Sequence, residues 1–164
     1  MYIVKNYCRE LNELKWNSSD VDLYNQSKEY IDTAIIPLIS VSVDSDFKHT
    51  VSKGEFISLV STELERQLKG RVFLFPSFSY LKNSSTVVED LSKWGEELQK
   101  EFKHVIFLTS DEKLKDKGGD DQNGQLIWLP SMPLEHMDDQ LKRKLLQDQI
   151  EQILNILLQS WNKS

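Results

Sequence analysis

Four short runs of apolar residues alternate with longer amphipathic stretches along the chain. The runs cover residues 33–39, 72–75, 105–108 and 126–129. Continuous apolar runs of this length are typical of strands that are buried on both faces, as in parallel sheets. Pro37, Pro76 and Pro130 lie in or just after three of them. Because proline cannot donate to a strand ladder, we expect each of these prolines to stand at a strand end.

The intervening stretches have the spacing of amphipathic helices. Ser52 and Glu55 form a capping box before one helix, and Gly70 follows as its stop signal. Thr86 and Glu89 form a second capping box before another apolar helical face. The predicted helices cover residues 18–30, 52–69, 86–102 and 138–161, and residues 40–51 are predicted to be a polar loop.

Alternation of strands and helices predicts right-handed crossovers between parallel strands. The predicted fold class is α/β, a three-layer α/β/α sandwich with a short, mostly parallel four-stranded sheet of the flavodoxin or Rossmann type. The connection over residues 110–124 is barely long enough for a parallel return, so the direction of the fourth strand stays open. The chain has 164 residues, which fits one domain. We assign residues 16–164 to it and residues 1–15 to a poorly ordered N-terminal extension.

Charge and composition exclude several classes of protein. The formal net charge is −6 and no basic face is visible, which disfavours nucleic acid as a partner. No stretch of about 18 apolar residues predicts a membrane span. The single cysteine, Cys8, can form neither an internal disulfide nor a zinc site. Dinucleotide and phosphate-binding glycine motifs and the nucleophile elbow are absent from the sequence. We therefore predict a cytoplasmic protein with no cofactor and no metal.

Polar side chains follow each predicted strand, where open parallel sheets bind their ligands. The candidates are Asp44, Asp46, Ser77, Tyr80, Asp111, Ser131, Glu135 and His136. The same residue types are also ordinary in turns and helix caps. Convergence of the carboxylates and Tyr80 on one concave pocket would favour an enzyme, whereas scatter into solvent would disfavour one.

The last predicted helix is longer than the sheet that it covers. It spans roughly 36 Å at 1.5 Å per residue, whereas a four-residue strand spans roughly 13 Å. Its apolar end forms a candidate interface with Leu154, Leu157, Leu158 and Trp161. This end could pack on the N-terminal helix, or it could meet a second copy or a partner protein.

No pattern in the chain specifies a reaction. The favoured hypothesis is a cytosolic, non-enzymatic binding or regulatory module that acts through protein contacts. The alternative is a hydrolase or transferase that binds a small molecule or nucleotide at the carboxyl edge of the sheet. A purely structural homodimer subunit, with the last helix as its interface, is the third reading.

Four segments resemble the YpiF-like family, a group of uncharacterised bacterial proteins with a domain of unknown function. The segments are Lys15–Trp16 and residues 30–38, 67–71 and 126–135. The resemblance begins at about Lys15, so residues 1–14 look like an addition before the usual start. It implies a bacterial cytosolic protein. It brings no established activity, so no functional residue can be carried over.

Overall fold

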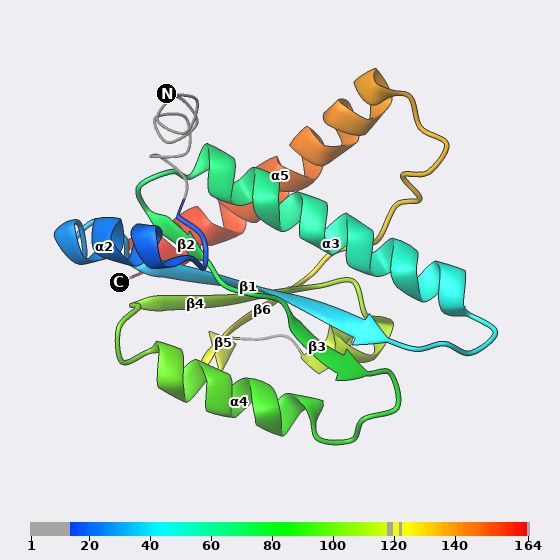
Figure 1. Cartoon of the computed structure of the whole chain (residues 1–164), viewed down its shortest axis with the longest axis horizontal. Coiled ribbons are helices and arrows are strands. Elements are labelled where there is room, and N and C mark those ends of the chain that lie inside the picture. Colours follow the sequence, from blue (N-terminus) through cyan, green and yellow to red (C-terminus); the bar gives the residue numbers. More distant parts are fainter. Residues whose placement is uncertain (1–13, 118–119, 122, 164) are drawn as a thin grey trace, which may run out of the picture.

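The computed structural model of the chain describes residues 14–117, 120–121 and 123–163 (Figure 1). Its strands are β1 (Thr33–Val41), β2 (Val72–Leu74), β3 (Phe78–Leu81), β4 (His104–Thr109), β5 (Asp120–Asp121) and β6 (Gly124–Trp128). Its helices are α2 (Ser18–Gln26), α3 (Phe47–Gln67), α4 (Val87–Leu98) and α5 (Asp139–Asn162), together with a 3-10 helix, η1 (Glu112–Lys117).

The strands form a mostly parallel sheet in the order β2-β1-β4-β6-β5, and β3 pairs with β1 on the side of β2. The four main strands therefore follow the order of flavodoxin-like folds. The fourth predicted strand, β6, is parallel to β4, with Ile106 opposite Gln125 and Thr109 opposite Trp128. The connection that looked barely sufficient does allow a parallel return, because η1 lies within it. The short strand β5 is antiparallel to β6.

Helices cover both faces of the sheet, so the predicted three-layer α/β architecture is confirmed. In Figure 1, α3 and α5 lie on one face and α4 lies on the other. The core on the α4 face includes Tyr24 of α2, Phe73 and Phe102. The core on the α3 face includes Phe56 and Ile150.

The prediction that Pro37 ends the first strand is wrong, because β1 continues to Val41. Backbone groups alternate sides along a strand, so Pro37 faces the same side as Thr33 and Ile35. The Thr33 N–H and the Ile35 carbonyl bond to the chain at β2. Pro37 lies between the part of β1 that pairs with β2 and the part that pairs with β3. No strand residue is therefore paired with Pro37 on this side. The missing N–H therefore costs no ladder bond, and β3 pairs with the remainder of β1.

The helix predicted to begin at the Ser52 capping box begins earlier, at Phe47. The connection after β1 is therefore shorter than the loop predicted over residues 40–51. The first turns of α3 direct Phe47 and Val51 outward, so they add nothing to the apolar periodicity of the buried face. The later positions Phe56, Val60 and Leu64 are buried as predicted.

The predicted N-terminal extension falls in two parts. Residues 1–13 lie outside the described residues. Leu14 is buried, and its N–H donates to Oε1 of Glu65 on α3 at 2.7 Å. Lys15 forms a bridge with Leu74 of β2. Leu14 and Lys15 therefore pack with the domain.

Helix α5 packs on α3 and on the sheet through Ile150, Ile153 and Leu157. The alternative that its apolar end rests on the N-terminal helix is wrong, because α2 belongs to the core on the opposite face. None of the helices in the described part of the chain has the length and apolar character that a membrane crossing requires.

Candidate functional site

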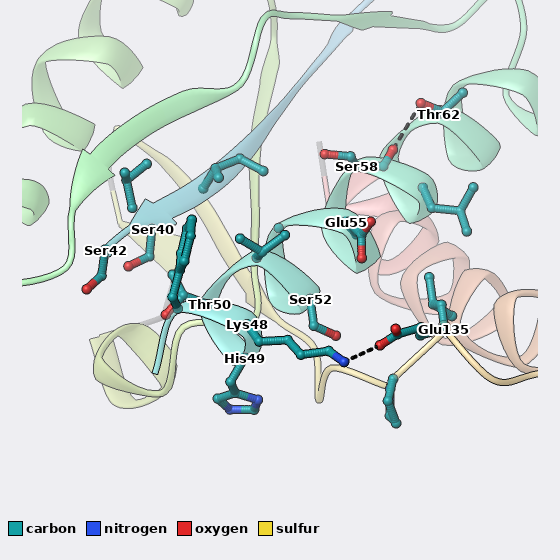
Figure 2. A pocket seen from close by; sticks show the side chains of 18 of the residues that line it. Ser40, Ser42, Lys48, His49, Thr50, Ser52, Glu55, Ser58, Thr62 and Glu135 are labelled. Carbon is teal, nitrogen blue, oxygen red and sulfur yellow. Dashed lines mark hydrogen bonds and ion pairs between the residues drawn. The ribbon is translucent and has the colours of Figure 1, made fainter. Parts of the chain in front are cut away.

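A groove of about 1340 Å³ runs along the exposed side of α3 (Figure 2). We call it the α3 groove. Its walls come from the end of β1, from α3, from the segment that leads to α5, and from the beginning of α5. The lining residues are Ile39, Ser40, Val41, Ser42, Phe47, Lys48, His49, Thr50, Val51, Ser52, Gly54, Glu55, Ser58, Leu59, Thr62, Pro133, Leu134, Glu135 and Lys142.

The α3 groove is mainly apolar where α3 approaches β1. Val41, Phe47 and Val51 are each more than two-fifths exposed, which is unusual for three large apolar side chains lining one groove. Gly54 permits the close approach of helix and strand. A Cβ at this position would lie 3.2 Å from Cγ2 of Ile39, so a larger side chain would compete for the space.

Two charged residues of the groove, Lys48 and Glu135, form an ion pair at its rim. Nζ of Lys48 lies 2.8 Å from Oε2 of Glu135, as Figure 2 shows, and His49 lies apart from this pair. The ammonium of Lys48 lowers the pKa of Glu135, and the carboxylate raises the pKa of Lys48. Both groups are thus held in their charged forms, and neither is poised to exchange a proton near neutral pH.

Asp44 and Asp46 bind Lys82 outside the lining of the groove. The Nζ atom of Lys82 lies 3.3 Å from Oδ2 of Asp44 and 3.4 Å from Oδ2 of Asp46. The pKa of Asp44 is lowered chiefly because its carboxylate accepts the Asp46 N–H, with Ser42 and Lys82 adding to the effect. These two aspartates form a charged turn at the start of α3.

Tyr80 and Asp111 meet on the other face of the sheet. The Tyr80 hydroxyl donates to Oδ2 of Asp111 at 2.6 Å, and its ring packs against Phe78 in the core on the α4 face. Burial raises the pKa of Tyr80, and the hydrogen bond to Asp111 raises it further. Oδ1 of Asp111 also accepts the Lys113 N–H at 3.0 Å. This pair is a structural contact between β3 and the turn after β4.

The remaining candidates do not complete a catalytic cluster. Ser77 is exposed in the link between β2 and β3, and Ser131 is half-buried after β6. His136 is exposed, with Nε2 3.9 Å from Oε2 of Glu135. Of the eight candidate residues, Glu135 is the one that lines the α3 groove. Within the described ranges, no three His, Cys, Asp or Glu side chains are grouped closely enough to hold a metal ion.

Sequence reasoning missed the apolar residues of the α3 groove. The spacing of Phe47 and Val51, four residues apart in a stretch interpreted as a polar loop, was the available signal. It indicated a helical face, although not a buried one.

The candidate interface on α5 is mostly occupied within the chain. Leu157 is buried in the core, and Leu154 and Trp161 are half-buried against it. Leu158 is 48% exposed and points away from that core. An interface through this helix stays a prediction that rests on Leu158.

Comparison with known proteins identifies relatives along most of the chain. Residues 22–161 match the model of the family described as "Protein of unknown function (DUF2487)". The chain is 48% identical over 149 residues to the "Uncharacterized protein YpiF" of Bacillus subtilis (strain 168). The aligned region covers 91% of this chain and 99% of that protein. These matches confirm the resemblance found in the sequence. No solved structure matches.

Proposed function

Because the chain belongs to the DUF2487 family of proteins of unknown function, we propose its role from the α3 groove. We propose that it is a cytoplasmic, non-enzymatic binding module that takes an uncharged, apolar segment of a partner protein in this groove. The observation that carries the proposal is the exposed apolar row of Val41, Phe47 and Val51 beside the ion pair of Lys48 and Glu135.

The apolar row supports a protein partner. Exposed apolar side chains gathered in one concavity mark interaction sites more often than those scattered singly. Val41 ends β1, and Phe47 and Val51 lie one helical turn apart on α3. An apolar segment laid along this row would remove all three side chains from water, which is the main favourable term in protein association.

The pairing of rim charges indicates the chemistry of the partner segment. Lys48 and Glu135 satisfy each other at 2.8 Å, so a charged group on the partner would have to compete with an existing ion pair. Because both side chains are largely exposed, breaking this pair costs at most about 1 kcal/mol. An uncharged segment avoids this cost.

The placement of the predicted site residues other than Glu135 argues against a hydrolase or transferase. A general base must lie within hydrogen-bond reach of the bound reactant. Asp44, Asp46, Tyr80 and Asp111 do not line the groove, and each is bonded to a group outside it. The protein-contact reading is therefore the better supported one.

Selection of peptides tests this proposal. We would select binders from a displayed library of random twelve-residue peptides on the wild-type chain, and measure their affinity for the Val51→Asp variant. We expect enrichment of uncharged peptides rich in apolar residues, and a loss of affinity of about tenfold or more in the variant, since a buried unpaired carboxylate is strongly disfavoured.

Val88→Asp is the matched control, because Val88 and Val51 are both 47% exposed and Val88 lies on α4. Its affinity for the selected peptides should equal that of the wild-type chain. Failure to enrich any peptide, or equal loss in both variants, would refute the proposal. A thermal-shift screen with nucleotides, sugars and metal ions runs in parallel, because ligand binding to the folded state raises apparent stability. A shift abolished by Val51→Asp alone would support the small-molecule alternative instead.

A further inference from the structure

The outer edges of the sheet differ in whether another segment of the chain pairs with them. The outer edge of β2 is covered, because the Leu74 N–H donates to the Leu14 carbonyl at 2.8 Å. The outer edge of β6 is covered by β5. The edge strand β3 pairs with β1 on its inner side, and no described segment pairs with its outer side. An uncovered strand edge is a template for pairing with another chain.

The outward groups of β3 belong to Ser79 and Leu81. The Lys82 N–H donates to the Val41 carbonyl, so Lys82 and, by the alternation of a strand, Tyr80 face β1. Ser79 and Leu81 therefore direct their N–H and C=O groups away from the sheet. The Leu81 carbonyl accepts the Ser84 N–H at 2.9 Å and keeps a second lone pair.

The two outward residues are arranged symmetrically about Tyr80, so this edge can pair with itself. In an antiparallel pairing across a two-fold axis, Ser79 of one copy stands opposite Leu81 of the other. The axis then passes between the two Tyr80 residues. Each pair of opposed residues exchanges two backbone hydrogen bonds. A self-complementary patch of this kind is what a two-fold dimer requires.

Charge does not oppose this pairing. Residues 78–81 carry no charged side chain. The neighbouring Lys82 is bonded to Asp44 and Asp46, and Nζ of Lys113 donates to the Lys82 carbonyl at 2.9 Å. Two ammonium groups thus offset two of the three carboxylates beside this strand, the third being that of Asp111, which accepts the Tyr80 hydroxyl. Two copies can approach here even though each carries a net charge of −6.

Apolar side chains beside the edge would add to the buried area. Leu81 is 69% exposed, and its register partner Val41 is also exposed. Both lie on the α3 face of the sheet, since Tyr80 faces the core on the α4 face. In the antiparallel pairing, Leu81 lies beside Ser79 of the second copy and is shielded from water.

We propose that the chain forms a two-fold symmetric dimer through antiparallel pairing of β3 with β3 of a second copy. The pairing joins the two sheets into one. It uses the backbone of Ser79 and Leu81, and it leaves α5 outside the interface. The proposal does not depend on the peptide segment proposed for the α3 groove.

The test is the mass in solution combined with amide hydrogen exchange at β3. We expect the wild-type chain to show twice its monomer mass of 19.2 kDa in light scattering, and slow exchange of the Ser79 and Leu81 amides. Ser79→Pro removes one outward donor from each copy without touching the bonds to β1. It should raise the dissociation constant by about tenfold or more, since two symmetry-related hydrogen bonds are lost.

Leu81→Lys is a second variant, in case proline disturbs the strand, because lysine on an edge strand opposes pairing. Leu158→Lys, which alters an exposed leucine of α5, is the control and should leave the dimer intact. A monomer at every concentration with fast exchange of Ser79 would overturn the proposal. A dimer dissociated by Leu158→Lys but not by the β3 variants would also overturn it, in favour of the α5 interface.

Discussion

Among the glycines of the described residues, Gly95 leaves the least room for a side chain. It lies inside α4 and faces the turn between β5 and β6. A Cβ built on Gly95 would lie 1.6 Å from the carbonyl oxygen of Asn123. The Asn123 amide also donates to the Ser92 hydroxyl of α4 at 2.7 Å. The helix thus docks on the backbone of this turn, and glycine is the side chain that permits it.

We predict that Gly95→Ala destabilises the protein, although alanine has the higher helix propensity. In an open helix the change would be worth about 1 kcal/mol in favour of alanine. Here the added methyl group meets backbone that cannot rotate away, so we expect the free energy of unfolding to fall by about 1–3 kcal/mol. Urea unfolding followed by circular dichroism measures the change.

The neighbouring change Glu96→Ala is the control, because Glu96 is exposed on the same helix. We expect it to alter the free energy of unfolding by less than about 0.5 kcal/mol. An equal effect of the two changes would mean that the contact between Gly95 and Asn123 does not limit the packing of α4.

At the scale of elements, α5 is held at its C-terminal end by Trp161. The Trp161 indole N–H donates to Oγ1 of Thr33 at 3.1 Å. The Arg71 guanidinium lies 3.6 Å from the centroid of the indole ring, and Nη2 of Arg71 lies 3.3 Å from Oδ2 of Asp32. These contacts join the end of α5 to the beginnings of β1 and β2. Trp161, one residue of the predicted α5 interface, is therefore held by contacts within the chain.

We predict that Trp161→Ala loosens the last turns of α5. The free energy of unfolding should fall by about 2 kcal/mol, less than for a fully buried tryptophan because the indole is half-buried. Amide hydrogen exchange across residues 157–162 should become faster, while exchange in α4 should not change. Leu158→Ala, on the exposed side of the same turn, is the control. Equal acceleration in both variants would contradict a specific anchor at Trp161.

At the scale of the whole molecule, the fold class could be predicted from the sequence, whereas several element boundaries could not. The three-layer α/β architecture could be predicted from the apolar runs and the helical spacing, because both patterns reflect which side chains are buried. The length of β1 and the presence of β3 could not be predicted, because Pro37 and Pro76 stop a strand in most contexts. Both prolines are tolerated here because they lie at the break between β2 and β3, which pair with β1 on the same side. The early start of α3 was missed for the same reason as the groove, since Phe47 and Val51 are exposed.

The candidate site was predicted less well than the fold. The rule that ligands bind at the carboxyl ends of strands selects the edge at which β1 ends beside the α3 groove. It does not assign each side chain to a face of the sheet. Tyr80 and Asp111 point to the α4 face, whereas the groove lies on the α3 face. Periodicity cannot assign a residue in an unrecognised strand such as β3 to one face or the other.

The domain includes Leu14, a residue of the predicted N-terminal extension. Leu14 is 1% exposed, although it precedes every predicted element. Its side chain joins the core on the α4 face, and its N–H donates to the buried Glu65 carboxylate. Because a buried carboxylate needs its donors, the chain around Leu14 stabilises α3 as well as the edge of β2.

We therefore predict that Leu14→Ala lowers the free energy of unfolding by about 2–5 kcal/mol, the cost of truncating a buried leucine. Urea unfolding measures it, and Val21→Ala on the exposed side of α2 should change it by less than about 0.5 kcal/mol. If Leu14→Ala were as mild as the control, the domain would begin after residue 15, as the sequence alone predicts. The backbone bond from Leu14 to Glu65 persists in the variant, so a large loss would be due to the leucine side chain and its place in the core.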